Sequence, residues 1–360
     1  MPSSTSSSDP TRSEPTGPDP TGHDVPPRPV PAGPWGATWL AAAAIAVVAV
    51  AAIELAMRAR GYRPSVKDDE YTWAWQRGRV SDSSPHTVAI LGTSRIHLAF
   101  SPSAFADALP GWTAVQLAID GTQPAGALVD LAGDPEFRGV AIVDTLESGI
   151  VAENRNSQRA YIAAYHRRWR APGAMAERWL ATRVQSHLAI LSDTLLRILA
   201  TGAAPPYVAT FPDRTQFADY ALTDIAERRK KLLDRLTPTP PTAQEADAWL
   251  ASVLEMEPYI AQIQARGGQV VYLRMPTCDE RWATDQITEP RPLYWNRLAA
   301  KTRAIAIHFA DFPSLRGFDC PDTSHIASKD GPRFTRAVID ILTDRGVFPR
   351  AGATASRSPR

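Results

Sequence analysis

Short apolar runs alternate with longer segments of helical periodicity along most of the chain. The apolar runs are nearly continuous, which is typical of parallel strands that are buried on both faces. Five runs are predicted strands: Thr87–Gly92, Thr113–Ile119, Gly139–Thr145, Gly268–Pro276 and Ala304–Asp311. Because strand and helix patterns alternate, the sequence predicts an α/β fold with a doubly wound parallel sheet.

One apolar run differs from the others because it is far too long for a strand. Residues Ala37 to Ile53 carry no charge, and Trp35 and Trp39 stand at one end. A helix from Trp35 to Met57 would span roughly 34 Å, enough for a hydrocarbon core of about 30 Å. A retained transmembrane helix is therefore predicted. A cleaved signal peptide and a buried Ala-rich helix are the alternatives, but a long polar tail precedes the run.

The same pattern divides the chain into parts of different character. Residues 1–34 mix Pro, Ser, Thr, Gly and Asp without apolar periodicity and are predicted to be disordered. A transmembrane helix (35–57), a juxtamembrane segment (58–84), the α/β domain (85–346) and a second disordered tail (347–360) follow. An insertion at about 148–257 is too long for an ordinary crossover and is expected to form a helical cap over the ligand-binding edge of the sheet.

Charge leaves the orientation of the membrane helix open. More basic residues follow the helix than precede it, which by the positive-inside rule places the α/β domain in the cytoplasm. The residues compared are Arg58, Arg60, Arg63 and Lys67 against Arg12 and Arg28. The 360-residue chain has a net charge of only +1, which argues against a nucleic-acid partner. Basic runs at His166–Arg170 and Glu227–Lys231 are interpreted as solvated helix faces.

Candidate chemistry gathers where predicted strands end. Ser94 directly follows the first strand, and "PDTSH" near the C-terminus places Asp322 three residues before His325. In an open parallel sheet, ligands bind at the carboxyl ends of the strands. A serine hydroxyl needs an imidazole to accept its proton, and the imidazole needs a carboxylate to orient it. Ser94, His325 and Asp322 can fill these roles, although Ser94 could equally be a helix N-cap.

These motifs carry a resemblance to a known superfamily. "LGTSRI" resembles the first block of the SGNH hydrolases, "LAIDGTQP" their second block and "PDTSH" their closing Asp-x-x-His. "LGTSR" followed by "LAIDG" further resembles membrane-anchored SGNH-like proteins of cell-surface polysaccharide O-acetylation. The resemblance implies a flavodoxin-like three-layer α/β/α sandwich, a Ser-His-Asp triad and a domain outside the cytoplasmic membrane. It also implies an oxyanion hole formed by the backbone N–H groups of Ser94 and Gly121.

The third block of the superfamily departs from its pattern here. It usually supplies an Asn to the oxyanion hole after the third strand, whereas this chain reads "VDTLESG". An acidic side chain would repel an oxyanion, so within this stretch Thr145 is the predicted replacement donor. Asn154 and Asn156, further along the chain, are the alternatives if that segment folds back. Loss of one such donor typically costs about 10²- to 10³-fold in rate.

Other polar residues near the predicted strand ends allow two interpretations each. Arg95 could bind an anionic group of the substrate or pair with Asp144. Arg274 could likewise contact the substrate or form a structural ion pair. Cys278 and Cys320 could be two separate buried thiols, or a disulfide in an oxidising compartment. No metal and no cofactor are predicted, because the seven histidines are scattered and no cysteine pair has zinc-like spacing.

Together these features predict acyl-ester chemistry, by an esterase or O-acetyltransferase, on an envelope or exported polysaccharide. The expected partners are the acylated carbohydrate, the membrane through one helix, and a membrane-bound acyltransferase. The alternative is an inactive SGNH-fold protein that binds polysaccharide or organises an acylation complex, which the missing Asn favours. A third, weaker interpretation is an esterase or lipase facing the cytoplasm, which the basic residues after the helix favour.

Overall fold

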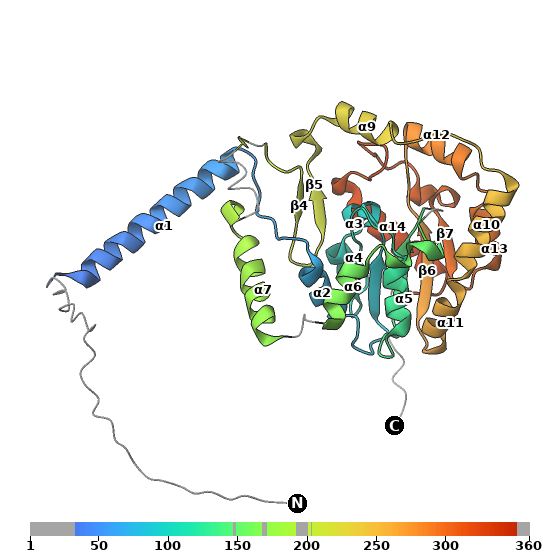
Figure 1. Cartoon of the computed structure of the whole chain (residues 1–360), viewed down its shortest axis with the longest axis horizontal. Helices are drawn as coiled ribbons and strands as arrows, with labels where there is room; N and C mark the ends of the chain where they lie inside the picture. The colour runs from blue at the N-terminus through green and yellow to red at the C-terminus, as the bar shows by residue number, and fades with distance from the viewer. Residues whose placement is uncertain (1–32, 147–148, 168–170, 192–200, 203, 351–360) are drawn as a thin grey trace, which may run out of the picture. The chain divides into compact units, whose positions relative to one another are not determined.

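A five-stranded parallel sheet organises the computed structural model of the chain (Figure 1). The structure describes residues 33–146, 149–167, 171–191, 201–202 and 204–350. Two units are described separately, Met1–Val50 and Ala51–Arg360, and the sheet lies in the second. The predicted disordered tails fall almost wholly outside the described residues.

All five predicted strands form, each shorter than its apolar run. They are β1 (Thr87–Leu91), β2 (Thr113–Gln116), β3 (Val140–Asp144), β6 (Gln269–Arg274) and β7 (Ile305–His308). Their order across the sheet is β2-β1-β3-β6-β7, and every neighbouring pair is parallel. This is the flavodoxin-like order, so the carboxyl ends of the strands share one edge where a ligand site is expected.

The two faces of the sheet are covered by separate hydrophobic cores. Ala89 and Leu91 of β1 point into one core, and Val88 and Ile90 point into the other, as the two-residue period of a strand requires. Separate groups of helices cover the two cores. The predicted three-layer α/β/α sandwich is therefore confirmed.

The helices that form these layers have the following bounds. On the first face they are α2 (Glu70–Gly78), α5 (Ala125–Gly133), α10 (Ala243–Leu254), α11 (Glu257–Ala265) and α13 (Trp295–Lys301). On the second face they are α3 (Ser94–Ala99), α4 (Pro102–Ala108) and α14 (Gly331–Asp344). Helix α12 (Asp279–Thr288) follows β6.

The insertion between β3 and β6 is not purely helical. It contains α6 (Arg159–Arg167), α7 (Pro172–Gln185) and α9 (Ile225–Leu233), and an antiparallel pair of strands, β4 (Val208–Thr210) and β5 (Gln216–Ala218). Its last part differs from the expectation, because Val253 of α10 packs into the first core. At the other end of the domain, Phe348 packs into the second core, two residues beyond the predicted boundary.

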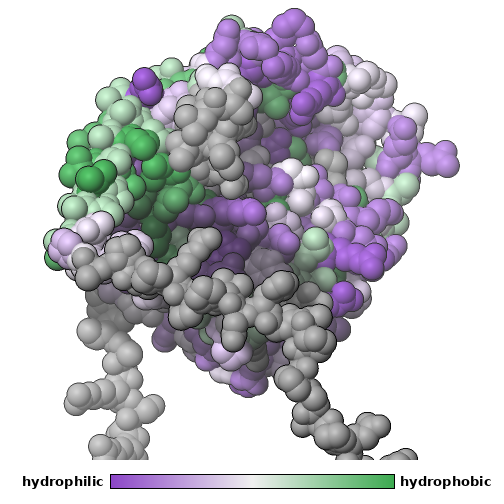
Figure 2. Space-filling model, turned by 60° about the vertical axis from the view of Figure 1, so that its left-hand side comes forward, coloured by the Kyte–Doolittle hydropathy of each residue, from purple (hydrophilic) through white to green (hydrophobic). Residues whose placement is uncertain are grey.

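The apolar helix α1 (Trp35–Ala59) has 25 residues and is long and apolar enough to cross a membrane. Most of the large hydrophobic side chains exposed in the described part of the chain belong to it, including Trp39, Leu40 and Ile45. In Figure 2 the hydrophobic colour is accordingly concentrated in one region, and most of the other visible surface is hydrophilic or pale. The helix ends two residues later than predicted.

Candidate active site

The structure of the turn after β1 shows which residue caps α3. Thr93 is the N-cap, because its Oγ1 accepts a hydrogen bond from the backbone N–H of Arg95 at 3.3 Å. Ser94 is the first residue of the helix, so capping leaves its hydroxyl unused. The sequence alone did not separate these two roles, and the structure assigns the cap to the neighbouring threonine.

Asp144, at the end of β3, holds this turn in place through hydrogen bonds to Thr93. Its Oδ2 accepts hydrogen bonds from the Thr93 backbone N–H at 3.2 Å and from the Thr93 hydroxyl at 2.9 Å. Burial raises the pKa of Asp144. Gly92 permits the close approach, because a Cβ there would lie 2.6 Å from the Cβ of Asp144 and 2.6 Å from Cγ2 of Ile96. A larger residue at position 92 would therefore displace the turn that carries Ser94.

Ser94, His325 and Asp322 form a continuous chain of hydrogen bonds. Ser94 Oγ lies 2.8 Å from His325 Nε2, and His325 Nδ1 lies 2.9 Å from Asp322 Oδ2. A carboxylate on Nδ1 holds the proton there, which leaves Nε2 to accept the serine proton. The structure thus brings together the three residues that the sequence predicts for a triad.

The loop that carries Asp322 and His325 is held in shape by its own backbone and by a disulfide. Asp322 Oδ1 accepts from the backbone N–H of His325 at 2.9 Å and of Ser324 at 3.2 Å. Cys278 and Cys320 are joined, with their Cα atoms 5.9 Å apart. The backbone N–H of Cys278 also donates to the carbonyl of Thr323 at 2.9 Å. The segment after β6 therefore braces the loop directly beside Asp322.

Two residues of the insertion contact Asp322, and the sequence analysis did not identify either. Arg228 Nε donates to Asp322 Oδ2 at 2.8 Å, and the Tyr220 hydroxyl donates to the same oxygen at 3.5 Å. Burial acts to raise the pKa of Asp322, but hydrogen bonds and charge from His325 and Arg228 hold it well below the usual range. Arg228 belongs to the basic run that was interpreted as a solvated face. Nothing local distinguishes it from Arg229, which pairs instead with Asp279 and Glu280.

A cavity of about 340 Å³ opens at Ser94 and His325. Its other wall is formed by α9 and the residues just before and after it, and these side chains are mostly charged or hydroxyl-bearing. They are Thr223, Asp224, Glu227, Arg228, Lys231, Leu232 and Arg235. A pocket with this lining suits a polar ligand better than a long acyl chain, which needs an apolar channel.

The two other predicted oxyanion donors are placed differently. Gly121 lies in an exposed turn after β2 with φ of +69°, a conformation that favours glycine. Thr145 is buried, its backbone N–H donates to the carbonyl of Leu273 at 3.0 Å, and its hydroxyl donates to the carbonyl of Leu146. Both donors of Thr145 are therefore already engaged in this structure.

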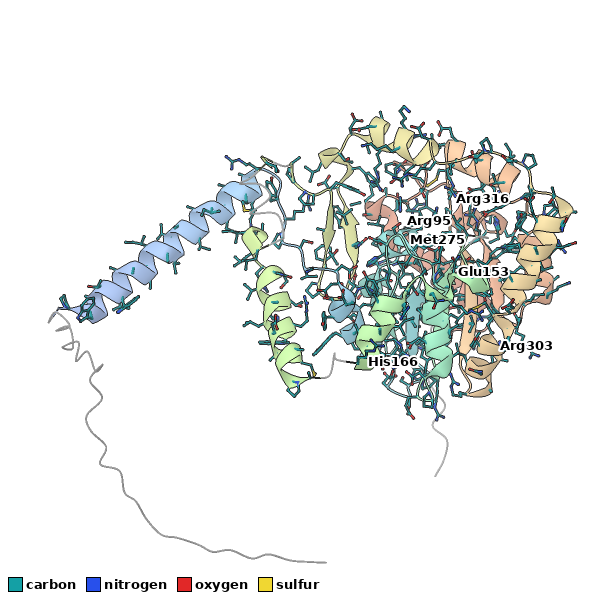
Figure 3. The ribbon with its side chains drawn as sticks, in the orientation of Figure 1. Arg95, Glu153, His166, Met275, Arg303 and Arg316 are labelled. Atoms are coloured by element: carbon teal, nitrogen blue, oxygen red, sulfur yellow. A yellow bond between two sulfur atoms is a disulfide. The ribbon has the colours of Figure 1, made fainter. Side chains whose placement is uncertain are left out.

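The two predicted substrate-binding arginines also differ from each other. Arg274 is buried and donates to Asp285 at 2.8 Å, as the structural interpretation requires. The guanidinium of Arg95 forms no hydrogen bond or ion pair with any described residue, and its Nε is buried. Burial lowers the pKa of Arg95 to about 10, against the opposing effect of the Asp144 charge. Arg95 therefore retains hydrogen-bonding capacity next to Ser94 (labelled in Figure 3).

Comparisons with known proteins add little to this description. No family model and no curated protein matches the chain. Three chains of solved structures match it. One is titled "Crystal Structure of TesA"; it is 15% identical, with a TM-score of 0.33, over 72% of this chain and 98% of that one. The fold class therefore rests on the sheet order and the layers, and the site rests on its own distances.

Proposed function

We propose that the chain catalyses acyl-ester chemistry with Ser94 as the nucleophile. The observation that carries the proposal is the 2.8 Å contact between Ser94 Oγ and His325 Nε2, together with the 2.9 Å contact between His325 Nδ1 and Asp322 Oδ2. Such a chain of serine, imidazole and carboxylate gives a weak nucleophile the base that it needs.

The proposed reaction has two halves that share one base. Ser94 Oγ attacks the acyl carbon while His325 Nε2 takes the serine proton, and His325 then returns that proton to the departing alcohol. A water or a sugar hydroxyl next attacks the acyl-enzyme and gives its proton to His325, which returns that proton to Ser94 Oγ as the bond between Oγ and the acyl group breaks. Asp322 orients the imidazole and stabilises its charged form throughout. The backbone N–H groups of Ser94 and Gly121 are the proposed oxyanion donors.

The lining of the cavity favours a short acyl group and a polar alcohol. Among the described residues that line the cavity, only Leu232 carries a large apolar side chain. A sugar hydroxyl fits such a surface through hydrogen bonds, whereas a long lipid chain would leave the charged groups without water. We therefore assign an acetylated or otherwise short-chain acylated carbohydrate as the substrate class.

Arg95 is the proposed contact for an anionic group of this substrate. Three guanidinium groups lie in electrostatic contact here, those of Arg95, Arg274 and Arg281, against the carboxylates of Asp144 and Asp285. Asp285 is already bound by Arg274 at 2.8 Å and by Arg281 at 2.7 Å. These five groups together carry one more positive than negative charge, and a substrate carboxylate or phosphate bound at Arg95 would neutralise it.

Two features support a location outside the cytoplasmic membrane. Helix α1 is apolar enough to anchor the chain, and the Cys278–Cys320 disulfide is of a kind that persists in oxidising compartments. The basic residues after α1 point the other way by the positive-inside rule. We give more weight to the disulfide, because it braces the loop that carries two members of the proposed triad.

A catalytically idle binding or scaffold protein is the second candidate, and the engaged donors of Thr145 favour it. Without a third donor, a tetrahedral oxyanion would be held only by backbone groups. In this case a membrane-bound acyltransferase would supply the chemistry, and the domain would bind the polysaccharide.

Turnover of a small chromogenic acetyl ester by the full chain in detergent separates the two candidates. The wild type should hydrolyse the ester, and Ser94→Ala should lose at least about 10³-fold of the rate. Ser101→Ala is a matched control, because Ser101 caps α4 and lies outside the cavity. Equal rates for wild type and Ser94→Ala would refute catalysis by Ser94 and favour the scaffold.

A further inference from the structure

Arg228 connects the insertion to the proposed triad more directly than any other cation in the described part of the chain. It projects from α9, whose register is set by Asp224, an N-cap that accepts from the backbone N–H of Glu227 at 2.9 Å. Its guanidinium lies 4.6 Å from the ring centroid of Tyr207, and its side chain is 25% exposed. The stem and the charged head are thus both held in place, with Nε directed at Asp322.

The carboxylate of Asp322 divides its two oxygens between different parts of the chain. Oδ1 accepts from the backbone of its own loop, at Ser324 and His325, and lies 3.1 Å from His325 Nδ1. Oδ2 accepts from Arg228 at 2.8 Å and lies 2.9 Å from His325 Nδ1. The imidazole and the guanidinium therefore share one oxygen, so the position of α9 influences how strongly Asp322 acts on His325.

The charge of Arg228 has a predictable sign of action. Asp322 is fully buried, and its negative charge stabilises a protonated imidazole. A guanidinium stays charged at every accessible pH, so Arg228 offsets part of that negative charge permanently. Other charged or titratable groups that face the triad come from the same insertion: Tyr207, Tyr220, Asp224, Glu227, Lys231 and Arg235. Glu227 and Lys231 pair with each other at 2.6 Å and largely cancel.

We propose that Arg228 is a positioning residue that docks the insertion onto Asp322 and offsets part of the carboxylate charge that acts on His325. This inference rests on the proposed function for its consequence in catalysis. The physical effect does not depend on turnover, because it concerns the resting protein.

The test is an NMR titration of the histidine rings in the full chain in detergent, with ¹⁵N-labelled histidine. The signal of His325 among the seven histidines is identified by its loss in His325→Gln. Arg228→Gln should raise the titration midpoint of His325 by about one pH unit, because the carboxylate of Asp322 then acts on His325 without the opposing charge of Arg228. Arg228→Lys keeps the charge and should leave the midpoint within about 0.3 units of wild type.

Arg229→Gln is the matched control, since Arg229 is the next residue on α9 and pairs with Asp279 and Glu280 instead. Its midpoint should equal that of wild type. If Arg228→Gln does not fold, Arg228→Met replaces it, because methionine keeps an unbranched stem over the Tyr207 ring. In an active protein, the acid limb of the kcat/KM profile should move with the midpoint.

Each outcome decides one claim. An unchanged midpoint in a folded, uncharged variant overturns the inference and reduces Arg228 to a structural contact. A shifted midpoint without ester turnover in the wild type supports the inference while the proposed catalysis fails. A melting temperature lowered in both Arg228→Gln and Arg228→Lys, with no shift in either, would show docking alone and would also overturn it.

Discussion

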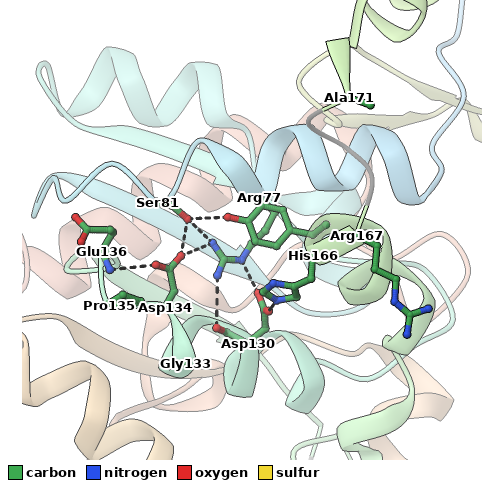
Figure 4. A pocket seen from close by; sticks show the side chains of 11 residues that line it. Arg77, Ser81, Asp130, Gly133, Asp134, Pro135, Glu136, His166, Arg167 and Ala171 are labelled. Carbon is green, nitrogen blue, oxygen red and sulfur yellow. Dashed lines mark hydrogen bonds and ion pairs between the residues drawn. The ribbon is translucent and has the colours of Figure 1, made fainter. Parts of the chain in front are cut away.

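Two cavities of this protein differ in size and in chemistry, and the smaller one is the better candidate for catalysis. The larger has a volume of about 630 Å³ and is lined by residues of α2, α5 and α6, among them Arg77, Asp130 and His166 (Figure 4). The smaller, of about 340 Å³, opens at Ser94. Figure 3 shows His166 well below Arg95, which is the neighbour of Ser94 in the sequence.

Four of the groups that line the larger cavity are linked to one another by ion pairs and hydrogen bonds. Arg77 binds Asp130 at 2.6 Å and Asp134 at 2.9 Å, and His166 binds the second oxygen of Asp130 at 2.6 Å. Arg77 and Asp130 therefore both have ion-pair partners inside this cavity. The chain of hydrogen bonds in the smaller cavity ends instead on a hydroxyl that no helix cap uses. Availability of a reactive group, rather than volume, therefore marks the candidate site.

The largest effect should come from the carboxylate of the proposed triad. Asp322→Asn removes the acceptor that fixes the tautomer of His325, so kcat for a chromogenic acetyl ester should fall about 10⁴-fold. Circular dichroism would verify the fold of the variant. A fall of less than tenfold would mean that His325 does not act through Asp322, and the contrast between the two cavities would lose its main support.

In the larger cavity the corresponding substitution should affect stability and spare activity. Asp130→Asn leaves Arg77 with only Asp134, and both Arg77 and Asp130 are almost fully buried. The free energy of unfolding should fall by about 3–5 kcal/mol, the cost of breaking a buried ion pair. Denaturant unfolding measures this, with the exposed Asp107→Asn as control. A loss of activity per folded molecule would show that this cavity takes part in the reaction.

The smallest effect is expected at Thr145, which directly follows β3. Its hydroxyl already donates to the carbonyl of Leu146, so Thr145→Val should change kcat less than about threefold and cost about 1 kcal/mol of stability. An oxyanion donor would cost about 10²- to 10³-fold instead. A loss of that size in kcat would show that the hydroxyl turns towards the substrate during the reaction.

The sequence predicts the fold because the signals for it are local. Each buried strand is a continuous apolar run, and the Asp-x-x-His spacing of Asp322 and His325 lies within one loop. The convergence of Ser94 with that loop follows from the rule that parallel strands end at one edge. These parts of the account required no knowledge of tertiary contacts.

The remaining parts of the site depend on contacts between distant segments. Thr93 rather than Ser94 caps α3 because Asp144, which is 51 residues away, fixes the threonine. Arg228 and Arg229 are identical neighbours in the sequence, and only the packing of α9 directs one of them to Asp322, which is 94 residues away. The strand pair of the insertion was also missed, because β4 and β5 have three residues each. No periodicity can be read from runs so short.

Covalent labelling of Ser94 tests the central claim most directly. A fluorophosphonate forms a stable adduct with a serine that a neighbouring base activates, so slow turnover or an unknown natural donor would not hide the result. Intact-mass and peptide analysis of the full chain should show one adduct on the peptide that contains Ser94, absent in Ser94→Ala and retained in Ser101→Ala. A folded wild-type protein that gains no adduct, or gains it elsewhere, would contradict the assignment of Ser94 as the nucleophile.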